Sequence, residues 1–322
     1  MEGSGAIQRT EGSGVDNVYR PVTATVLDIQ IEAGGHRPIR TFRFQVDDEA
    51  ERERFLHRPG QFVIVSHFGT GESVFAISSF PNTDGIVEVS VMRVGNVTGR
   101  LHELRPGDKV GLRGPYGNHF PVEDWKGKNM VFIGAGIGIS PVRSVYQWVL
   151  HPDHRDDYSD VTLIYGARTP ADLAYKEELK ALEARDDLDL WLCIDWKFGP
   201  KGPIEGDSEP GWQAINMKSP GDTVIREGQN RFTCFVPQLV EVVKPSPDNA
   251  IVVTCGPPIA IRFITQALDR LGWSPDQIYT TLENRMKCGI GKCGRCNIGE
   301  IYVCKHGPVF TYRQVQEMAD EF

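Results

Sequence analysis

The chain has 322 residues and a formal net charge of −8, with 40% apolar and 24% charged residues. This length predicts two or three domains, each with enough chain to form a core. The acidic balance argues against a nucleic-acid partner, which needs a basic face. No run of about 18 apolar residues occurs, which argues against a membrane span.

The first segment, residues 1–17, is polar and rich in glycine and serine, so we expect a disordered lead-in. It lacks the basic and then apolar pattern of a signal peptide. We therefore expect a cytoplasmic protein whose seven cysteines stay reduced. Structural disulfides are a poor explanation for cysteines in that compartment.

Residues 18–123 contain short β-rich stretches, such as "RTFRFQV" and "GIVEVSVMRV", several of which alternate apolar and polar residues. Glycine and proline separate them, and this spacing predicts a small antiparallel β-barrel. In "VMRVGNVTGRL", Arg93, Gly95 and Thr98 fall between a strand and a short helical turn. The start of such a turn is suited to binding a diphosphate.

Residues 124–275 alternate between apolar strands and helices, which predicts a doubly wound parallel sheet. In the last expected helix, "IAIRFITQALDRLG", the apolar residues Ile259, Phe263, Leu268 and Leu271 fall on one side.

Residues 195–230 lose this periodicity and are rich in glycine, proline and polar residues, which indicates an insertion. Loops of this length are uncommon in compact domains and are usually functional or disordered. One interpretation is a tolerated surface loop. The aromatic residues Trp196, Phe198 and Trp212 favour contact with a partner protein instead, because interfaces are enriched in aromatics.

A glycine-rich turn follows the first expected strand of this sheet. Gly134, Gly136 and Gly138 precede Ser140 and Pro141 at the start of a helix. Here the backbone can approach a pyrophosphate closely and the helix N–H groups can meet it. Glycines at such a turn also serve packing alone, and the spacing differs from the dinucleotide-binding G-x-G-x-x-G.

Two other segments are expected at the same edge of the sheet. Cys255, Gly256 and Pro257 follow a later strand, and Arg168 follows the second strand. Ligands of open α/β sheets bind beyond the carboxyl ends of the strands, so these residues point to the same nucleotide. Arg168 suits an adenosine phosphate or ribose, and it equally suits a solvated surface position.

The last segment, residues 276–322, holds four cysteines in the spacing C-x4-C-x2-C-x7-C: Cys288, Cys293, Cys296 and Cys304. Four thiolates bind either zinc or an iron–sulfur cluster. The first three lie in one glycine-rich loop, which matches the C-x4-C-x2-C loop of plant-type [2Fe–2S] proteins. The spacing favours this cluster over zinc.

Together these segments resemble the ferredoxin–NADP reductase superfamily. With the cysteine segment included, the chain is similar to the electron-transfer subunit of dihydroorotate dehydrogenase, the corresponding subunit of anaerobic sulfite reductase and the gamma subunits of cytoplasmic [NiFe] hydrogenases. One departure is that Ser73 stands where the flavin motif of the superfamily has arginine. Backbone N–H groups of Ile77 or Ser78 are then expected to serve the flavin.

The resemblance implies three cofactors and the residues beside them. FAD is expected at Phe75, Ala76, Ile77, Ser78, Met92, Arg93, Gly95, Thr98 and Gly99; NAD(H) or NADP(H) at Gly134, Gly136, Gly138, Ser140, Pro141, Arg168, Cys255, Gly256 and Pro257; and one [2Fe–2S] cluster at Cys288, Cys293, Cys296 and Cys304.

The function implied is that of a subunit which moves electrons between NAD(P)H and a partner redox subunit through FAD and the cluster. The complex would resemble a hydrogenase, a heterodisulfide reductase or a sulfite reductase. No residue is assigned a catalytic role, since hydride transfer is at the flavin. Two alternatives are a self-sufficient NAD(P)H-dependent flavin reductase acting on a small acceptor and a non-catalytic scaffold whose cysteines hold zinc.

Overall fold

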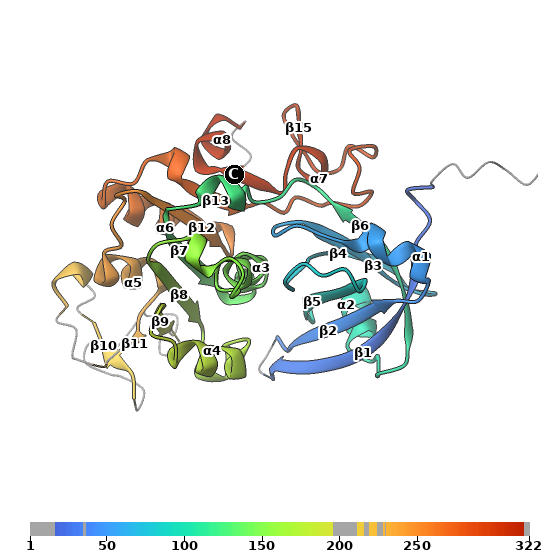
Figure 1. Cartoon of the computed structure of the whole chain (residues 1–322), viewed down its shortest axis with the longest axis horizontal. Coiled ribbons are helices and arrows are strands. Elements are labelled where there is room, and N and C mark those ends of the chain that lie inside the picture. Colours follow the sequence, from blue (N-terminus) through green and yellow to red (C-terminus); the bar gives the residue numbers. More distant parts are fainter. Residues whose placement is uncertain are drawn as a thin grey trace, which may run out of the picture.

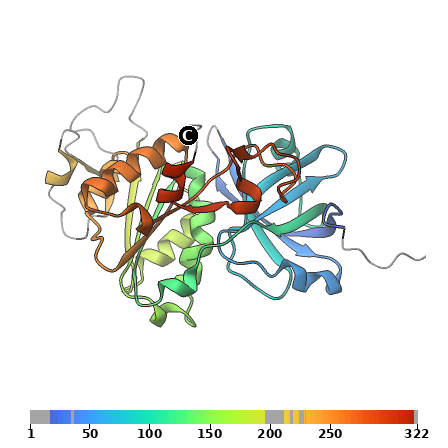
Figure 2. The ribbon, with the colours of Figure 1, turned by 90° about the horizontal axis from the view of Figure 1, so that it is seen from above.

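The computed structural model describes residues 17–34, 37–195, 211–215, 219–223, 228 and 230–318. Within these ranges the chain forms two bodies side by side, and its C-terminal part lies along the top of both (Figure 1). Seen from above, the C-terminal segments cross from one body to the other (Figure 2). The expected lead-in lies outside the described residues, except for Asn17. No helix in the described ranges has the length and apolarity that crossing a bilayer requires.

The first body is the antiparallel barrel that the short strands predict. Its strand order is β4-β3-β6-β1-β2-β5, and a bridge between Ile77 and Val89 brings the end of β4 onto β5. Val87, Val89 and Val91 occupy alternate positions of β5 and fill the interior. The elements are β1 (Val22–Ala33), β2 (Ile39–Val46), α1 (Glu49–Arg52), β3 (Phe62–His67), β4 (Gly71–Ala76), β5 (Ile86–Met92), α2 (Asn96–Leu101) and β6 (Lys109–Tyr116).

The second body is the predicted doubly wound sheet. Its strand order is β10-β11-β9-β8-β7-β12-β13-β16, and the pairing is parallel except at the antiparallel edge strand β16. The strands are β7 (Asn129–Ala135), β8 (Val161–Ala167), β9 (Asp189–Ile194), β10 (Gln213–Ala214), β11 (Arg231–Thr233), β12 (Ala250–Cys255), β13 (Ile278–Thr281) and β16 (Val309–Thr311). The helices are α3 (Ile139–Val149), α4 (Lys176–Glu183), α5 (Val236–Val243) and α6 (Pro258–Arg270).

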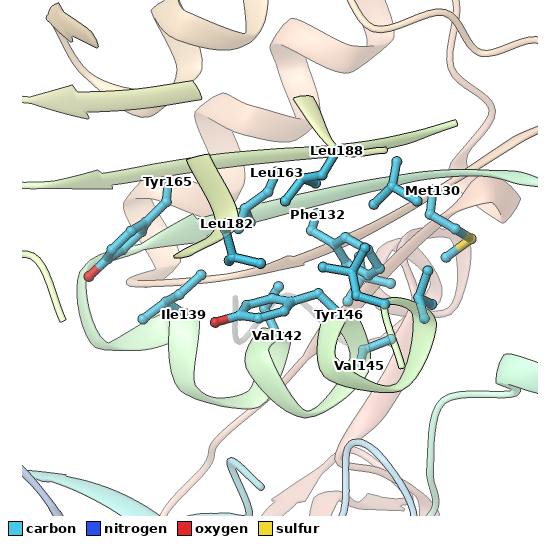
Figure 3. Close-up of a cluster of buried hydrophobic side chains, with 14 of the residues drawn as sticks. Met130, Phe132, Ile139, Val142, Val145, Tyr146, Leu163, Tyr165, Leu182 and Leu188 are labelled. Atoms are coloured by element: carbon cyan, nitrogen blue, oxygen red, sulfur yellow. The ribbon is translucent and has the colours of Figure 1, made fainter. Parts of the chain in front are cut away.

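Both faces of this sheet are covered, which explains why its strands are apolar throughout. In β7, Met130 and Phe132 join the core under α3 and α4, whereas Val131 and Ile133 join the core under α5 and α6. Figure 3 shows the first of these cores, with Phe132 packed above the apolar side of α3. The period of two in the strand thus divides one apolar run between two cores.

Part of the expected insertion belongs to the sheet. Gln213 and Ala214 form the edge strand β10, parallel to β11. Trp212 is only 9% exposed and packs into the core under α3 and α4, so the expectation that it contacts a partner is wrong. Its burial satisfies the apolar ring within the chain. Trp196 and Phe198 lie outside the described residues.

The C-terminal segment does not separate cleanly at residue 275. β13 lies beyond that position and pairs with β12, and β16 returns the chain to the same sheet. Between β13 and β16 the chain forms a lobe built from β14 (Asn297–Ile298), β15 (Ile301–Tyr302) and α7 (Val303–His306). Helix α8 (Tyr312–Glu317) follows β16. The lobe shares a core with Phe62 and Ile64 of β3, so it is packed on the barrel.

Candidate cofactor sites

Strand β4 offers an open backbone edge, because it pairs with β3 on one side and lies at the end of the barrel sheet. Phe75 and Ala76 are partly exposed there. Ile77 and Ser78 are fully buried, and their N–H groups donate to the carbonyls of Gln61 (3.0 Å) and Glu88 (2.9 Å). The expected use of these two N–H groups for the flavin is therefore wrong. Both N–H groups already donate to carbonyls within the barrel.

The turn after β5 is held by one side chain. Thr98 is buried, and its hydroxyl accepts the N–H groups of Val94 (3.0 Å) and Gly95 (2.9 Å) while donating to the Gly95 carbonyl. The Thr98 hydroxyl thus fixes the turn that leads into α2. The N–H groups of the first turn of α2 have no intrahelical acceptors, as at the start of any helix. Arg93 is exposed next to the helix, with its Nε 4.0 Å from a Cβ built at Gly99. Met92, the last residue of β5, is partly buried.

The two glycine motifs of the parallel sheet meet at its carboxyl edge. A Cβ at Gly138 would lie 2.4 Å from the carbonyl oxygen of Cys255, and one at Gly256 would lie 2.7 Å from Cβ of Ala135. These glycines therefore allow the two loops to touch. Gly136 differs, because its φ is +58° and a Cβ there would meet nothing within 4 Å. That open concave turn fits a pyrophosphate.

The other expected coenzyme residues are divided between the interior and the surface. Ser140 and Pro141 are buried in the first turn of α3. Arg168 is 58% exposed, and its Nε lies 3.9 Å from the Asp172 carboxylate, a weak pair that leaves the guanidinium available. Pro257 is exposed beside Gly256.

Cys255 ends β12 next to the segment that leads into the cluster lobe. Its Sγ accepts a hydrogen bond from the hydroxyl of Thr281 at 3.0 Å. Burial raises the pKa of the Cys255 thiol to about 11. The thiol is therefore neutral at physiological pH and serves as a packing group at the edge of the nucleotide site.

The four clustered cysteines approach one another in pairs. The Sγ atoms of Cys296 and Cys304 are 3.3 Å apart, close enough to bind one iron atom. The Cys293 side chain interacts with the Cys288 thiol, and the Cys293 N–H donates to Sγ of Cys288 at 3.4 Å. Among the described residues, no group of three or more His, Cys, Asp or Glu side chains is placed to hold a metal ion. Two pairs fit the two irons of a [2Fe–2S] cluster better than one tetrahedral zinc.

Backbone N–H groups surround these sulfurs, as they do in iron–sulfur sites. Gly291 donates to Sγ of Cys304 at 3.1 Å, and Lys292 donates to Sγ of Cys288 at 3.2 Å. Burial raises the pKa of the Cys288 thiol, but N–H groups of Ile290, Cys293 and Lys292 outweigh it and bring that pKa to about 7. The loop therefore stabilises the thiolate that a metal requires.

Three sequence models match successive parts of the chain. They are described as the oxidoreductase FAD-binding domain (residues 35–120), the oxidoreductase NAD-binding domain (residues 132–266) and the iron–sulfur cluster binding domain of dihydroorotate dehydrogenase B (residues 283–316). Each range contains the residues assigned above to that cofactor.

Similar proteins share most of the length. The chain is 36% identical to sulfhydrogenase 1 subunit gamma of Pyrococcus furiosus over 277 residues, 85% of either chain. It is 30% identical to a probable dihydroorotate dehydrogenase B (NAD(+)) electron transfer subunit of Thermococcus kodakarensis over 277 residues, 85% of this chain and 90% of the relative.

The chain belongs to the family of these electron-transfer subunits. It carries an FAD-binding, an NAD-binding and an iron–sulfur cluster-binding domain, as its sequence predicts. A solved structure of an NADH-dependent reduced ferredoxin-NADP oxidoreductase has the same fold, with a TM-score of 0.66 and 19% identity over 96% of this chain and 91% of that chain.

Within this family fold, a buried arginine that the sequence reasoning missed joins the barrel to the cluster loop. Arg113 of β6 donates from Nη1 to the carbonyl of Cys288 at 3.2 Å and from Nη2 to the Glu72 carboxylate at 2.7 Å. Its side chain is 5% exposed, and Glu72 lies on β4, the strand at which we expect the flavin. The sequence did carry a signal, because Arg113 stands at a strand position between apolar neighbours. A buried arginine is rare unless it has a partner.

A second arginine joins the segment that follows β4 to helix α3. Arg143 of α3 donates from Nη1 to the Ser78 carbonyl at 3.0 Å and to the Glu88 carboxylate at 2.9 Å. Its Nε donates to Glu178 at 2.7 Å, and its guanidinium stacks over the Tyr175 ring at 4.6 Å. The barrel and the nucleotide domain are thus joined by a largely buried cation that is paired through Nε and Nη1.

We expect Arg113→Met to lower the free energy of unfolding by about 2 kcal/mol, because the half-exposed Glu72 carboxylate and the Cys288 carbonyl lose their donor. Chemical denaturation, monitored by the release of flavin, measures the change in the free energy of unfolding. The double variant Arg113→Met/Glu72→Gln is expected to recover part of the loss, since no carboxylate is left unpaired. An unchanged unfolding midpoint together with an unchanged cluster spectrum would contradict the role of Arg113.

Proposed function

We propose that this chain is the subunit that exchanges electrons between NAD(H) or NADP(H) and a partner redox subunit, through FAD and one [2Fe–2S] cluster. One observation carries the proposal. The flavin strand is held at its start to the cluster loop through Glu72, Arg113 and the Cys288 carbonyl, and at its end to the coenzyme helix through Ser78 and Arg143. One strand therefore positions all three sites.

The residues of the chain supply position and shielding. Gly136 leaves room for the pyrophosphate, and Gly138 and Gly256 bring the two nucleotide loops together. Phe75 and Ala76 present the edge of β4 to the flavin. When bound, FAD supplies the conversion between a two-electron hydride donor and a one-electron cluster. The chain needs no acid–base pair for this chemistry.

The partner is another redox subunit, in a hydrogenase-, heterodisulfide-reductase- or sulfite-reductase-like complex in the cytoplasm. The names of the relatives, subunits of a sulfhydrogenase and of dihydroorotate dehydrogenase B, support this assignment. So does the position of the cysteine loop, where Cys293 is exposed. A cluster near the surface suits electron transfer to a second polypeptide.

The test is an anaerobic titration of the purified chain with NADH and, separately, with NADPH. We expect the visible flavin absorbance to bleach and the electron paramagnetic resonance signal of a reduced [2Fe–2S] cluster to appear with one of the two. A colourless protein with stoichiometric zinc would favour the scaffold. A native form that runs as a single chain and rapidly reduces its own acceptor would favour the self-sufficient reductase.

A further inference from the structure

Each of the four cluster cysteines has a basic neighbour in the chain. Lys287, Lys292 and Arg295 directly precede Cys288, Cys293 and Cys296, and Lys305 directly follows Cys304. Arg285 lies just before this segment. Residues 285–305 contain five basic residues and one acidic residue, which gives this segment a net charge of +4. Because the whole chain has a net charge of −8, the rest of the chain carries −12.

These five side chains are at the surface and are not neutralised by the chain itself. Arg285, Lys287, Lys292, Arg295 and Lys305 are all exposed. Within the described residues none of them takes part in an ion pair. By contrast, the exposed residues Arg100 and Arg313 each pair with a carboxylate. We call these five residues the basic rim.

One residue of the rim that is distant in sequence also lies against the cysteine loop in space. A Cβ at Gly291 would lie 3.0 Å from Cδ of Lys305, so the Lys305 stem crosses the loop between Cys288 and Cys293. Lys292 adjoins Cys293, the exposed cysteine. Figure 1 shows β15 and α7 in the lobe that lies above the barrel. The rim therefore lies beside the exposed cysteine of the cluster site.

We propose that the basic rim is the docking surface for the acidic face of the electron-transfer partner, a proposal that rests on the proposed function of the chain. A positive patch on an otherwise acidic protein attracts an acidic partner and orients it, whereas basic proteins are repelled at the rim. Docking at the rim places the redox centre of the partner directly over Cys293.

The negative charge of the cluster is too small to neutralise the five cations of the rim. An oxidised cluster with four thiolates carries about two negative charges. The rim would remain positive by about two charges with the cluster bound. A partner with carboxylates on its surface would complement this remaining positive charge.

Electron transfer with two probes of opposite charge tests the proposal. The full-length protein with its cofactors is mixed in a stopped-flow instrument with a reduced acidic [2Fe–2S] ferredoxin, and flavin bleaching reports electron entry. In the second reaction, the NADH-reduced protein donates electrons to a basic cytochrome c. We expect the ferredoxin rate to fall and the cytochrome rate to rise as salt is added, because salt screens both interactions.

The rim variant Lys287→Glu/Lys292→Glu/Arg295→Glu is expected to lower the ferredoxin rate about tenfold at low salt and to raise the cytochrome rate. Partial unfolding would lower both rates. A more negative cluster potential would by itself slow electron entry from ferredoxin and speed electron exit to cytochrome c, so the reduction potential of the cluster is measured in the wild-type and rim proteins. Opposite rate changes at an unchanged potential are expected, and a shift in potential that accounts for both rates would overturn the proposal. The matched control, Arg37→Glu/Arg105→Glu/Lys244→Glu, makes the same charge change at exposed residues away from the lobe and should move both rates less than twofold.

If the rim variant loses its cluster, the neutral variant with glutamine at the same three positions takes its place, and iron content verifies loading. Rates with wild-type protein that do not depend on salt, or equal responses of rim and control variants, would overturn the proposal. So would salt-sensitive self-association of the chain through the rim. Failure of NADH and NADPH to reduce the wild-type cluster would instead overturn the proposed function.

Discussion

We expect the Cys296→Ser substitution to abolish the cluster and leave FAD bound. Cys296 is 1% exposed and its Sγ is 3.3 Å from that of Cys304, so we expect the two thiols to bind the same metal atom. Serine cannot supply the soft thiolate that iron–sulfur clusters prefer. The barrel has a separate core, which keeps its flavin residues in place. Coenzyme-dependent flavin bleaching should therefore survive in a protein that no longer reduces one-electron acceptors at the cluster.

Iron content and the electron paramagnetic resonance spectrum of the reduced protein measure the loss, and released flavin measures FAD. The matched control is Cys234→Ser, which changes another fully buried cysteine outside the lobe. We expect this control to retain iron in full. A Cys296→Ser protein with wild-type iron content and an unchanged reduced-state spectrum would show that Cys296 is not a ligand.

Replacing Gly136 with valine is expected to cut coenzyme-dependent flavin reduction about 100-fold, because a misplacement of about 1 Å is enough for such a loss. The φ of +58° disfavours a β-branched residue, and the added methyl groups would enter the open space of the turn. FAD content should not change, since the barrel binds it. Anaerobic stopped-flow with NADH and NADPH measures the rate of flavin bleaching.

The chain offers a control for the backbone strain alone. Gly127 also has a positive φ (+77°) and nothing within 4 Å of a built Cβ, but it precedes β7 at the amino edge of the sheet. Gly127→Val should lower stability to a similar extent and leave coenzyme reduction near the wild-type rate. A Gly136→Val protein that reduces its flavin at the wild-type rate would remove the turn from the coenzyme site.

Strand and helix types followed from local patterns. Short alternating strands predicted the barrel, and the alternation of apolar strands with helices predicted the parallel sheet. Both are present. The spacing of the four cysteines identified the iron–sulfur segment, because ligand spacing within one loop is a local property. A matching sequence model covers it at residues 283–316.

Which face of an element is buried was harder to predict. In α6 the expected apolar side included Ile259 and Phe263, which are 60% and 48% exposed, whereas Ile264 and Ala267 are buried. The orientation of a helix depends on the sheet and on α5 beneath it, and two apolar rows compete for that contact. Trp212 was misjudged for the same reason, since the core that receives it comes from distant strands.

The chemistry of each site was therefore readable from the sequence: a glycine turn for a nucleotide, four closely spaced cysteines for a cluster and a strand-rich barrel for a flavin. Each rests on residues a few positions apart. How the sites are joined was not readable. Arg113 reaches Cys288 across 175 positions and Arg143 reaches Ser78 across 65. Such pairs form because folding buries both partners together, and no periodicity along the chain records them.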